Sequence, residues 1–371
     1  MSIITISPAL PNMKVHFSDV PNIDFWVRIV MTVPALIIAI IAPFAGRLID
    51  RYGRLKLLWG ALVLYGLSGL SGLLIDDIYL LLFSRVLLGV AVGTSMTIVI
   101  TLVADYFEGM ERQKFLGLQV AFMSVGGILF IGLGGFLADF SWRYPFVLYG
   151  LAMIVLPMSI LFLKEPEKVI KVSNNQTADK APKFLLLLYI NTMIMWIIFF
   201  FIPVQVPFYL NEIGIEKASL IGAAIALSTA FSAISAISFS RIKNRISFVM
   251  VYTIGYLLMG LGFYILSLSN SYIMVVIAMI ICGLGMGIMI PNTNLWVMKL
   301  VPLSIRGREI GKLTTFWFMG QFISPFILLL LLGQMSSQSV FKMAAIILVL
   351  LAIGFRLLLT SSSVKELMQE S

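Results

Sequence analysis

The chain has a single cysteine, Cys282, and a single histidine, His16. One cysteine excludes an internal disulfide, and one residue of each kind excludes a metal site built from several cysteines or histidines. His16 lies in a polar connection, where a solvated loop residue is the ordinary interpretation. Cys282 lies in an apolar run, where a small packed side chain is expected. We therefore expect neither a metal nor another cofactor.

Charged residues are also scarce, at 12% of 371 residues, whereas 60% are hydrophobic. A soluble domain has about 25% charged and about 45–50% apolar residues, and the mean hydropathy of +1.04 points the same way. The net charge of +9 comes from short basic clusters between apolar runs, which excludes one continuous basic face for nucleic acid. Lipid is therefore the expected solvent for most of the chain.

Acidic residues are missing from the interior of every apolar run. The 17 Asp and Glu residues lie in connections or near the ends of the runs. The runs also contain no nucleophile–histidine pair and no phosphate-binding loop, so an enzyme is not expected.

What the sequence has in abundance is uninterrupted apolar length. Eleven runs are long enough to cross a hydrocarbon core of about 30 Å as helices. No short apolar run preceded by basic residues marks a signal peptide. The sequence therefore predicts an all-α membrane protein with eleven complete spans, at 26–46, 57–75, 79–103, 114–137, 144–163, 184–206, 218–240, 247–268, 272–296, 312–333 and 338–360.

Most of the 26 Lys and Arg residues lie in one set of alternate connections and at the C-terminal end. Connections rich in Lys and Arg are cytoplasmic by the positive-inside rule, so we expect a cytoplasmic C-terminus. Apart from Arg85, which lies within a span, the remaining basic residues are assigned to the opposite set: Lys14, Arg28, Arg143, Lys217 and Lys342.

An offset of 194 residues aligns the two halves of the chain without a gap. It places Arg47 on Arg241 and Gly89 on Gly283, and other loop basics and helix glycines agree. Shared membrane composition is the alternative explanation. A parallel repeat of helix bundles is typical of secondary transporters. We therefore predict an N-terminal bundle at 1–163, a cytoplasmic linker at 164–183 and a C-terminal bundle at 184–371.

The first basic loop, residues 46–56, reads GRLIDRYGRLK. It resembles the loop G-x-L-x-D-R-x-G-R between helices 2 and 3 of the major facilitator superfamily. The resemblance implies a major facilitator fold of two six-helix bundles, with Asp50 at the N-terminus of helix 11 and Arg54 paired with Asp105. Topology determination alone is the alternative role. The residues implied in gating are Gly46, Asp50, Arg51, Gly53, Arg54 and Asp105.

Residues 1–10, followed by Pro11, are apolar but too short to cross a membrane. Many transporters of this superfamily end their first helix with a sequence like SPALP. We therefore expect a first helix without its front half and twelve spans in a parent protein, through either a misplaced start codon or a true truncation.

Arg85 lies about eight residues inside the run that follows Asp77. A charge at this depth is costly and faces water or a partner. With Gly89 and Gly93, Arg85 resembles the R-x-x-x-G-x-x-x-G motif of helix 4, which implies proton coupling or binding of an anionic substrate group. A structural, snorkelling arginine is the alternative.

Residues 126–135 resemble the exporter motif G-x-x-x-G-P-x-x-G-G of helix 5. Gly126, Gly134 and Gly135 fit the motif, whereas Phe130 and Ile131 replace its central Gly-Pro. The departure weakens the case for export, although the small residues still allow close helix packing. Taken whole, the chain resembles bacterial drug and metabolite exporters.

A substrate site is expected near the bilayer midplane between the halves. Its candidates are polar and aromatic residues within spans, although a helix–helix hydrogen bond is the alternative for each. They are Arg85, Gln119, Asn191, Trp196, Gln205, Asn292, Asn294 and Gln321.

The resemblance implies secondary transport of a small amphipathic molecule by alternating access, by a monomer in the lipid bilayer of the bacterial inner membrane. Proton-coupled export is the leading hypothesis, because Met-rich and aromatic spans suit an adaptable apolar cavity. Proton antiporters of the superfamily commonly use an intramembrane carboxylate. Such a carboxylate is often in helix 1, so either the coupling acid belongs to the missing front of that helix, or Asp24 or Asp139 near the outer face serves, or the protein is not proton-coupled. Uptake of a nutrient or organic anion, and a non-transporting remnant or sensor, are the alternatives.

Overall fold

The computed structural model describes residues 3–166, 181–302 and 305–358. Every regular element in these ranges is a helix, and eleven membrane-length spans coincide with the eleven apolar runs, so the predicted fold class is confirmed. The spanning segments are α2 (Ile23–Tyr52), α3 (Arg54–Leu70) with the 3-10 helix η2 (Ser71–Leu73), α4 (Ile78–Tyr106), α5 (Gly109–Ala138), the 3-10 helix η3 (Tyr144–Gly150) with α6 (Leu151–Phe162), α7 (Phe184–Phe199) with α8 (Phe201–Glu212), α9 (Ala218–Lys243), α10 (Phe248–Leu268), α11 (Tyr272–Leu300), α12 (Arg306–Leu332) and α13 (Ser337–Leu358).

Polar residues fix where several helices begin. The Asp77 carboxylate accepts a hydrogen bond from the N–H of Leu80 at 2.7 Å and caps α4. Ser247 and Ser271 cap α10 and α11 in the same way. Each cap satisfies a backbone donor that the first turn of a helix leaves without a partner.

Proline interrupts the helices that begin each half. Before α2, the 3-10 turn η1 (Ser7–Ala9) leads into α1 (Leu10–His16), with a proline near the start of each. In the second half the helix breaks at Phe200 between α7 and α8. Pro203 has no N–H to donate to the carbonyl of Phe199, which explains the break.

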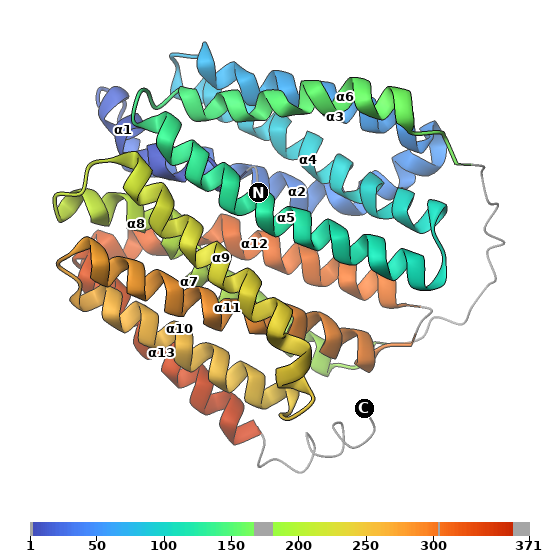
Figure 1. Cartoon of the computed structure of the whole chain (residues 1–371). Coiled ribbons are helices and arrows are strands. Elements are labelled where there is room, and N and C mark those ends of the chain that lie inside the picture. The colour runs from blue at the N-terminus through green and yellow to red at the C-terminus, as the bar shows by residue number, and fades with distance from the viewer. Residues whose placement is uncertain (1–2, 167–180, 303–304, 359–371) are drawn as a thin grey trace.

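The helices form two groups, with α1–α6 in the upper part of Figure 1 and α7–α13 in the lower part. The same contact recurs in both groups. A Cβ added at Gly89 on α4 would lie 2.9 Å from the carbonyl oxygen of Pro34 on α2. A Cβ added at Gly283 on α11 would meet the carbonyl oxygen of Ser228 on α9. Gly283 follows Gly89 by 194 residues, and Ser228 follows Pro34 by the same number. The internal repeat of the sequence is therefore also a repeat of helix packing.

Large apolar side chains cover the outside of the groups. Leu161 and Phe162 on α6 and Ile237 on α9 are each more than three-quarters exposed. Such exposure is unfavourable in water but favourable in hydrocarbon. The helices are therefore built to present apolar faces to lipid.

The spans have two chemically different ends. The Lys- and Arg-rich connections, including the one between α9 and α10, meet the helices at one end, which we call the basic end. The other end, where α4, α9, α11 and α13 begin, we call the opposite end. The two halves meet along α5 and α9 and along α2 and α12.

Candidate functional site

Among the described side chains of α5, the buried ones lie in the part nearest the opposite end. No residue with a described side chain between Gly109 and Gly126 is buried, whereas Gly127, Ile131, Gly135 and Ala138 are. The spacing of these four residues places them on one face of the helix. The side chains of residues 113, 116 and 120, which continue this face toward the basic end, lie outside the described part of the structure.

The buried face of α5 touches α9 of the other half, backbone to backbone. A Cβ added at Gly135 would lie 2.5 Å from the carbonyl oxygen of Ala218 and 3.0 Å from the Cα of Gly222. A Cβ at Gly222 would in turn lie 2.9 Å from the carbonyl oxygen of Ile131. Only glycine permits this approach, because any side chain would separate the two backbones. Gly135 was selected by the helix 5 motif, whereas its partner Gly222 was not.

Two hydrogen bonds also join the halves at the opposite end. The Ser7 hydroxyl donates to the carbonyl oxygen of Pro203 at 2.5 Å. The Asp139 carboxylate, at the end of α5, accepts from the N–H of Ser219 at 3.1 Å, in the first turn of α9. A carboxylate is favoured there because the helix N-terminus carries partial positive charge.

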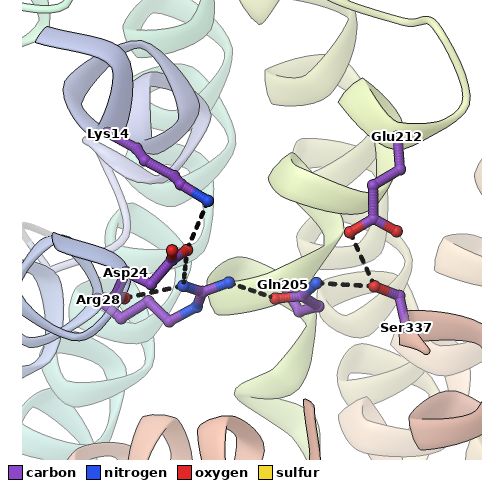
Figure 2. Close-up of polar contacts among 6 residues, drawn as sticks. All are labelled: Lys14, Asp24, Arg28, Gln205, Glu212 and Ser337. Carbon is purple, nitrogen blue, oxygen red and sulfur yellow. Dashed lines mark hydrogen bonds and ion pairs between the residues drawn. The ribbon is translucent and has the colours of Figure 1, made fainter. Parts of the chain in front are cut away.

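Arg28 makes a third polar link between the halves (Figure 2). Its Nη1 donates to the carbonyl oxygen and carboxylate of Asp24 at 2.8 and 3.1 Å, and its Nη2 donates to Gln205 Oε1 at 2.7 Å. The predicted span 26–46 includes Arg28, whereas the count of basic residues assigned it to a connection, which is wrong. The residue lies in the second turn of α2 and is only 3% exposed, because its charge is compensated by partners that sequence alone does not reveal.

At the basic end, Arg54 forms the ion pair that the loop motif predicts. Its Nε lies 2.9 Å from Asp105 Oδ2. Glu165, which follows α6, accepts from the N–H groups of Arg54 and Leu55 at 2.6 and 2.8 Å and so caps α3. Gly53 adopts φ = +90° at the break between α2 and α3, a conformation that glycine adopts readily.

The other residues of that loop motif give less information. The backbone of Gly46 lies in α2, and a Cβ added there would meet no atom within 4 Å. The side chains of Asp50 and Arg51 lie outside the described part of the structure, as does the expected contact of Asp50 with α12.

Arg85 is enclosed within the first half. Its Nη2 donates to the carbonyl oxygen of Ser68 at 2.5 Å and that of Gly69 at 3.3 Å, both on α3. The guanidinium carbon lies 4.9 Å from the centre of the Phe146 ring and 5.3 Å from that of Tyr149. Its Nε also donates to the Ser84 hydroxyl of the same helix at 3.2 Å, so its partners are carbonyls, a hydroxyl and aromatic rings within the first half. Its role in coupling or substrate binding stays a prediction.

Two tryptophans stack where α7 meets α12. The rings of Trp196 and Trp317 are 4.3 Å apart, and neither indole N–H has a hydrogen-bond partner within the described residues. The two helices approach closely at Gly320 on α12, where an added Cβ would lie 2.6 Å from the carbonyl oxygen of Met193 on α7. Gln321 follows and is buried. Trp317 was not among the residues selected from the sequence.

The predicted amide residues are not gathered into one cluster. Asn191 accepts from the Tyr256 hydroxyl at 2.6 Å, and Asn292 donates to the carbonyl oxygen of Phe248 at 3.0 Å, so both join helices of the second half. Gln119 on α5 and Asn294 on α11 are half-buried.

One buried carboxylate was not among the residues expected inside the protein. Glu309 was placed outside the spans, yet it lies in the first turn of α12 with a side chain 1% exposed. It pairs with Arg308 at 2.7 Å and Lys312 at 3.0 Å, and it accepts from the Tyr189 hydroxyl at 2.7 Å. Two adjacent cations and a helix N-terminus suit a negative charge, so Glu309 is built as a fixed ion-pair partner.

Comparison with known proteins agrees with this architecture. The sequence matches the Major Facilitator Superfamily over residues 1–250 and 188–369. The chain belongs to this superfamily of membrane transporters. Its structure superposes on the inward open conformation of the xylose transporter XylE from E. coli with a TM-score of 0.74 at 14% identity, covering 95% of this chain and 91% of that one. A D-xylose–proton symporter superposes with a TM-score of 0.73 at 16% identity, covering 95% and 93%.

Sequence relatives include transporters named for drug resistance. Multidrug resistance protein 2 of Bacillus subtilis is 39% identical over 127 residues, which are 34% of this chain and 32% of the relative. Quinolone resistance protein NorA of Staphylococcus aureus is 30% identical over 164 residues, 44% of this chain and 42% of the relative. The matched stretch thus spans less than half the length of each relative.

Proposed function

We propose that the chain exports a small amphipathic compound by alternating access, with protons moving in the opposite direction. The observation that carries this proposal is the uneven packing of α5. Its last turns contact α9 backbone to backbone at Gly135, whereas none of the described side chains in its first half is buried. A transporter with one end of its two halves closed and the other open holds one of the two states that alternating access requires.

The orientation of this state follows from charge. Because Lys- and Arg-rich connections favour the cytoplasm, the basic end is inside and the opposite end outside. The C-terminus is then cytoplasmic, and the described conformation is open to the inside. Likeness to the inward open XylE structure supports this assignment.

The direction of transport is argued from relatives and from packing. Both named sequence relatives are resistance proteins, which fits removal of a compound from the cell. The glycines of the helix 5 motif that close the outer end are those on which the resemblance to exporters rests. The architecture alone is equally compatible with uptake, as by a sugar transporter with the same fold, because a fold does not fix the direction of transport.

The substrate class is argued from the Trp196–Trp317 pair. Trp196 is buried and Trp317 half-buried, and both indole N–H groups are buried without an acceptor among the described residues. A flat compound that carries a hydrogen-bond acceptor and reaches this pair would find apolar ring surface and two donors without partners. Proton coupling is assigned to Asp139, near the outer face, because Glu309 and Asp24 are each held by two cations.

Everted membrane vesicles test the proposal. Export predicts that an acidic lumen drives a flat amphipathic compound into vesicles that contain the chain, and that collapse of the pH gradient stops it. Trp317→Leu should raise the KM several-fold. Trp59→Leu is the matched control, because Trp59 lies on α3, outside the contact of the halves, and its N–H also has no partner among the described residues.

The same vesicles separate the alternatives. Accumulation only in right-side-out vesicles would replace export by uptake. No transport of a cation, a neutral compound or an organic acid in either orientation would refute export of these classes and favour the non-transporting alternative.

A further inference from the structure

Arg28 is one of the few charged side chains that the fold buries. It starts on α2 in the first half and ends against α8 in the second half, where its guanidinium carbon lies 4.1 Å from the centre of the Phe208 ring. Its carboxylate partner Asp24 is 47% exposed and also pairs with Lys14 at 2.8 Å. Asp24 belongs to the same helix as Arg28, so Gln205 is the residue that accepts a hydrogen bond from Arg28 across the two halves.

Gln205 is itself held from behind, as Figure 2 shows. Its Nε2 donates to the Ser337 hydroxyl oxygen at 3.0 Å, and that hydroxyl donates to Glu212 Oε1 at 2.9 Å. Every donor in this row points from Arg28 toward Glu212. The row starts at a cation and ends at a carboxylate, so the dipoles of the amide and the hydroxyl reinforce one another.

The orientation of the amide decides whether Arg28 is bound or repelled. A glutamine carries an acceptor oxygen on one side and a donor NH₂ on the other. With Ser337 accepting from Nε2, the oxygen necessarily faces the guanidinium, which has only donors. Glu212 accepts the Ser337 proton and so leaves the hydroxyl oxygen free to accept from Gln205. The exposed Glu212 thus fixes the acceptor that the buried Arg28 meets.

We propose that Gln205, Ser337 and Glu212 are positioning residues that hold Arg28 as a latch on the outer end of the transporter. The inference rests on the alternating access of the proposed function. Opening of the outer end separates α2 from α8, breaks the Arg28–Gln205 bond and returns a buried charge to water. The latch therefore favours the outer-closed state, and its strength is set at Ser337 and Glu212.

Labelling of a cysteine at the closed junction tests the latch. Thr5 is 2% exposed and lies where α5 meets η1, against Gly134. Thr5→Cys in a Cys282→Ala background gives one reporter, because Cys282 is the single native cysteine. The measurement is its rate of reaction with a membrane-impermeant maleimide added to the outer side. No substrate is needed, so failure of export and failure of the latch are separate results.

We expect Gln205→Leu and Ser337→Ala each to raise the labelling rate about tenfold, which corresponds to about 1.4 kcal/mol. Glu212→Gln should raise it less, because an amide still accepts from Ser337. Ser339→Ala is the matched control: Ser339 is exposed near the start of α13, and its hydroxyl lies 3.1 Å from the exposed Ser336 hydroxyl. The control should label at the parent rate.

Arg28→Lys is the second test, because it keeps the charge but loses the forked donor geometry. Combined with Ser337→Ala it should label no faster than Arg28→Lys alone, since both changes break one interaction. Melting temperature, measured on each variant, separates the latch from a purely structural role, which would lower stability without changing the labelling rate.

Two results would overturn the latch. In the first, Gln205→Leu and Ser337→Ala label at the parent rate while Gly135→Val, which forces α5 from α9, labels fast. In the second, Gly135→Val also fails to label, which removes both the latch and the outer opening on which it depends.

Discussion

Gly135→Ala is the sharpest perturbation that the packing offers. The added Cβ would lie 2.5 Å from one backbone atom of α9 and 3.0 Å from another. Neither neighbour is the end of a flexible side chain, so the helices themselves must separate at the outer end. Overpacking of this kind costs about 1–3 kcal/mol.

Under the proposed alternating access, this cost falls on the described state only. In a state where the outer ends diverge, the added methyl group would meet no backbone of α9. The higher helix propensity of alanine, about 1 kcal/mol relative to glycine, applies in both states and cancels. The ratio of outer-open to outer-closed molecules should therefore rise about 5- to 150-fold. Gly222→Ala should act in the same direction, because its Cβ would lie 2.9 Å from the carbonyl oxygen of Ile131.

Distances between spin labels at the outer end measure this ratio. Phe140 and Glu216 are exposed residues beyond the ends of α5 and α8, in different halves, and cysteines there carry the labels in a Cys282→Ala background. We expect Gly135→Ala to add or enlarge a long-distance population. Gly132→Ala is the matched control on the same helix, where an added Cβ meets no atom within 4 Å. The reasoning fails if the folded Gly135→Ala protein shows the parent distances, or if Gly132→Ala shifts them equally.

Three further changes test the rest of the structure. Asp105→Asn and Arg54→Met should slow transport equally, because each removes the ion pair at 2.9 Å. The double variant should be no slower than either single variant, and transport rates of all three would check this. Glu165→Gln should cost about 1 kcal/mol of stability by weakening the cap of α3, and an unchanged melting temperature would count against it. Arg85→Lys should lower the melting temperature through lost bonds to two α3 carbonyls, while an altered substrate KM at unchanged stability would favour direct binding instead.

Much of the architecture was determined by the sequence alone. Apolar length gave all eleven spans, because a membrane leaves a helix of about 20 residues as the ordinary way to cross. The offset of 194 residues reappeared in the packing of Gly89 on Pro34 and of Gly283 on Ser228. The pairing of Arg54, in the loop motif, with Asp105, at the end of the fourth helix, was also predicted from the sequence.

Only the tertiary structure decided which residues join the two halves. Arg28 and Gln205 lie 177 positions apart, and Gly135 meets Gly222 from the other half of the chain. In a soluble protein the apolar face of a helix marks its contact surface. Here the faces toward lipid are as apolar as those toward other helices, so the pattern does not mark an interface. The sequence therefore specifies the helices and their order, whereas the junction of the two halves at the opposite end arises from contacts that hydropathy does not encode.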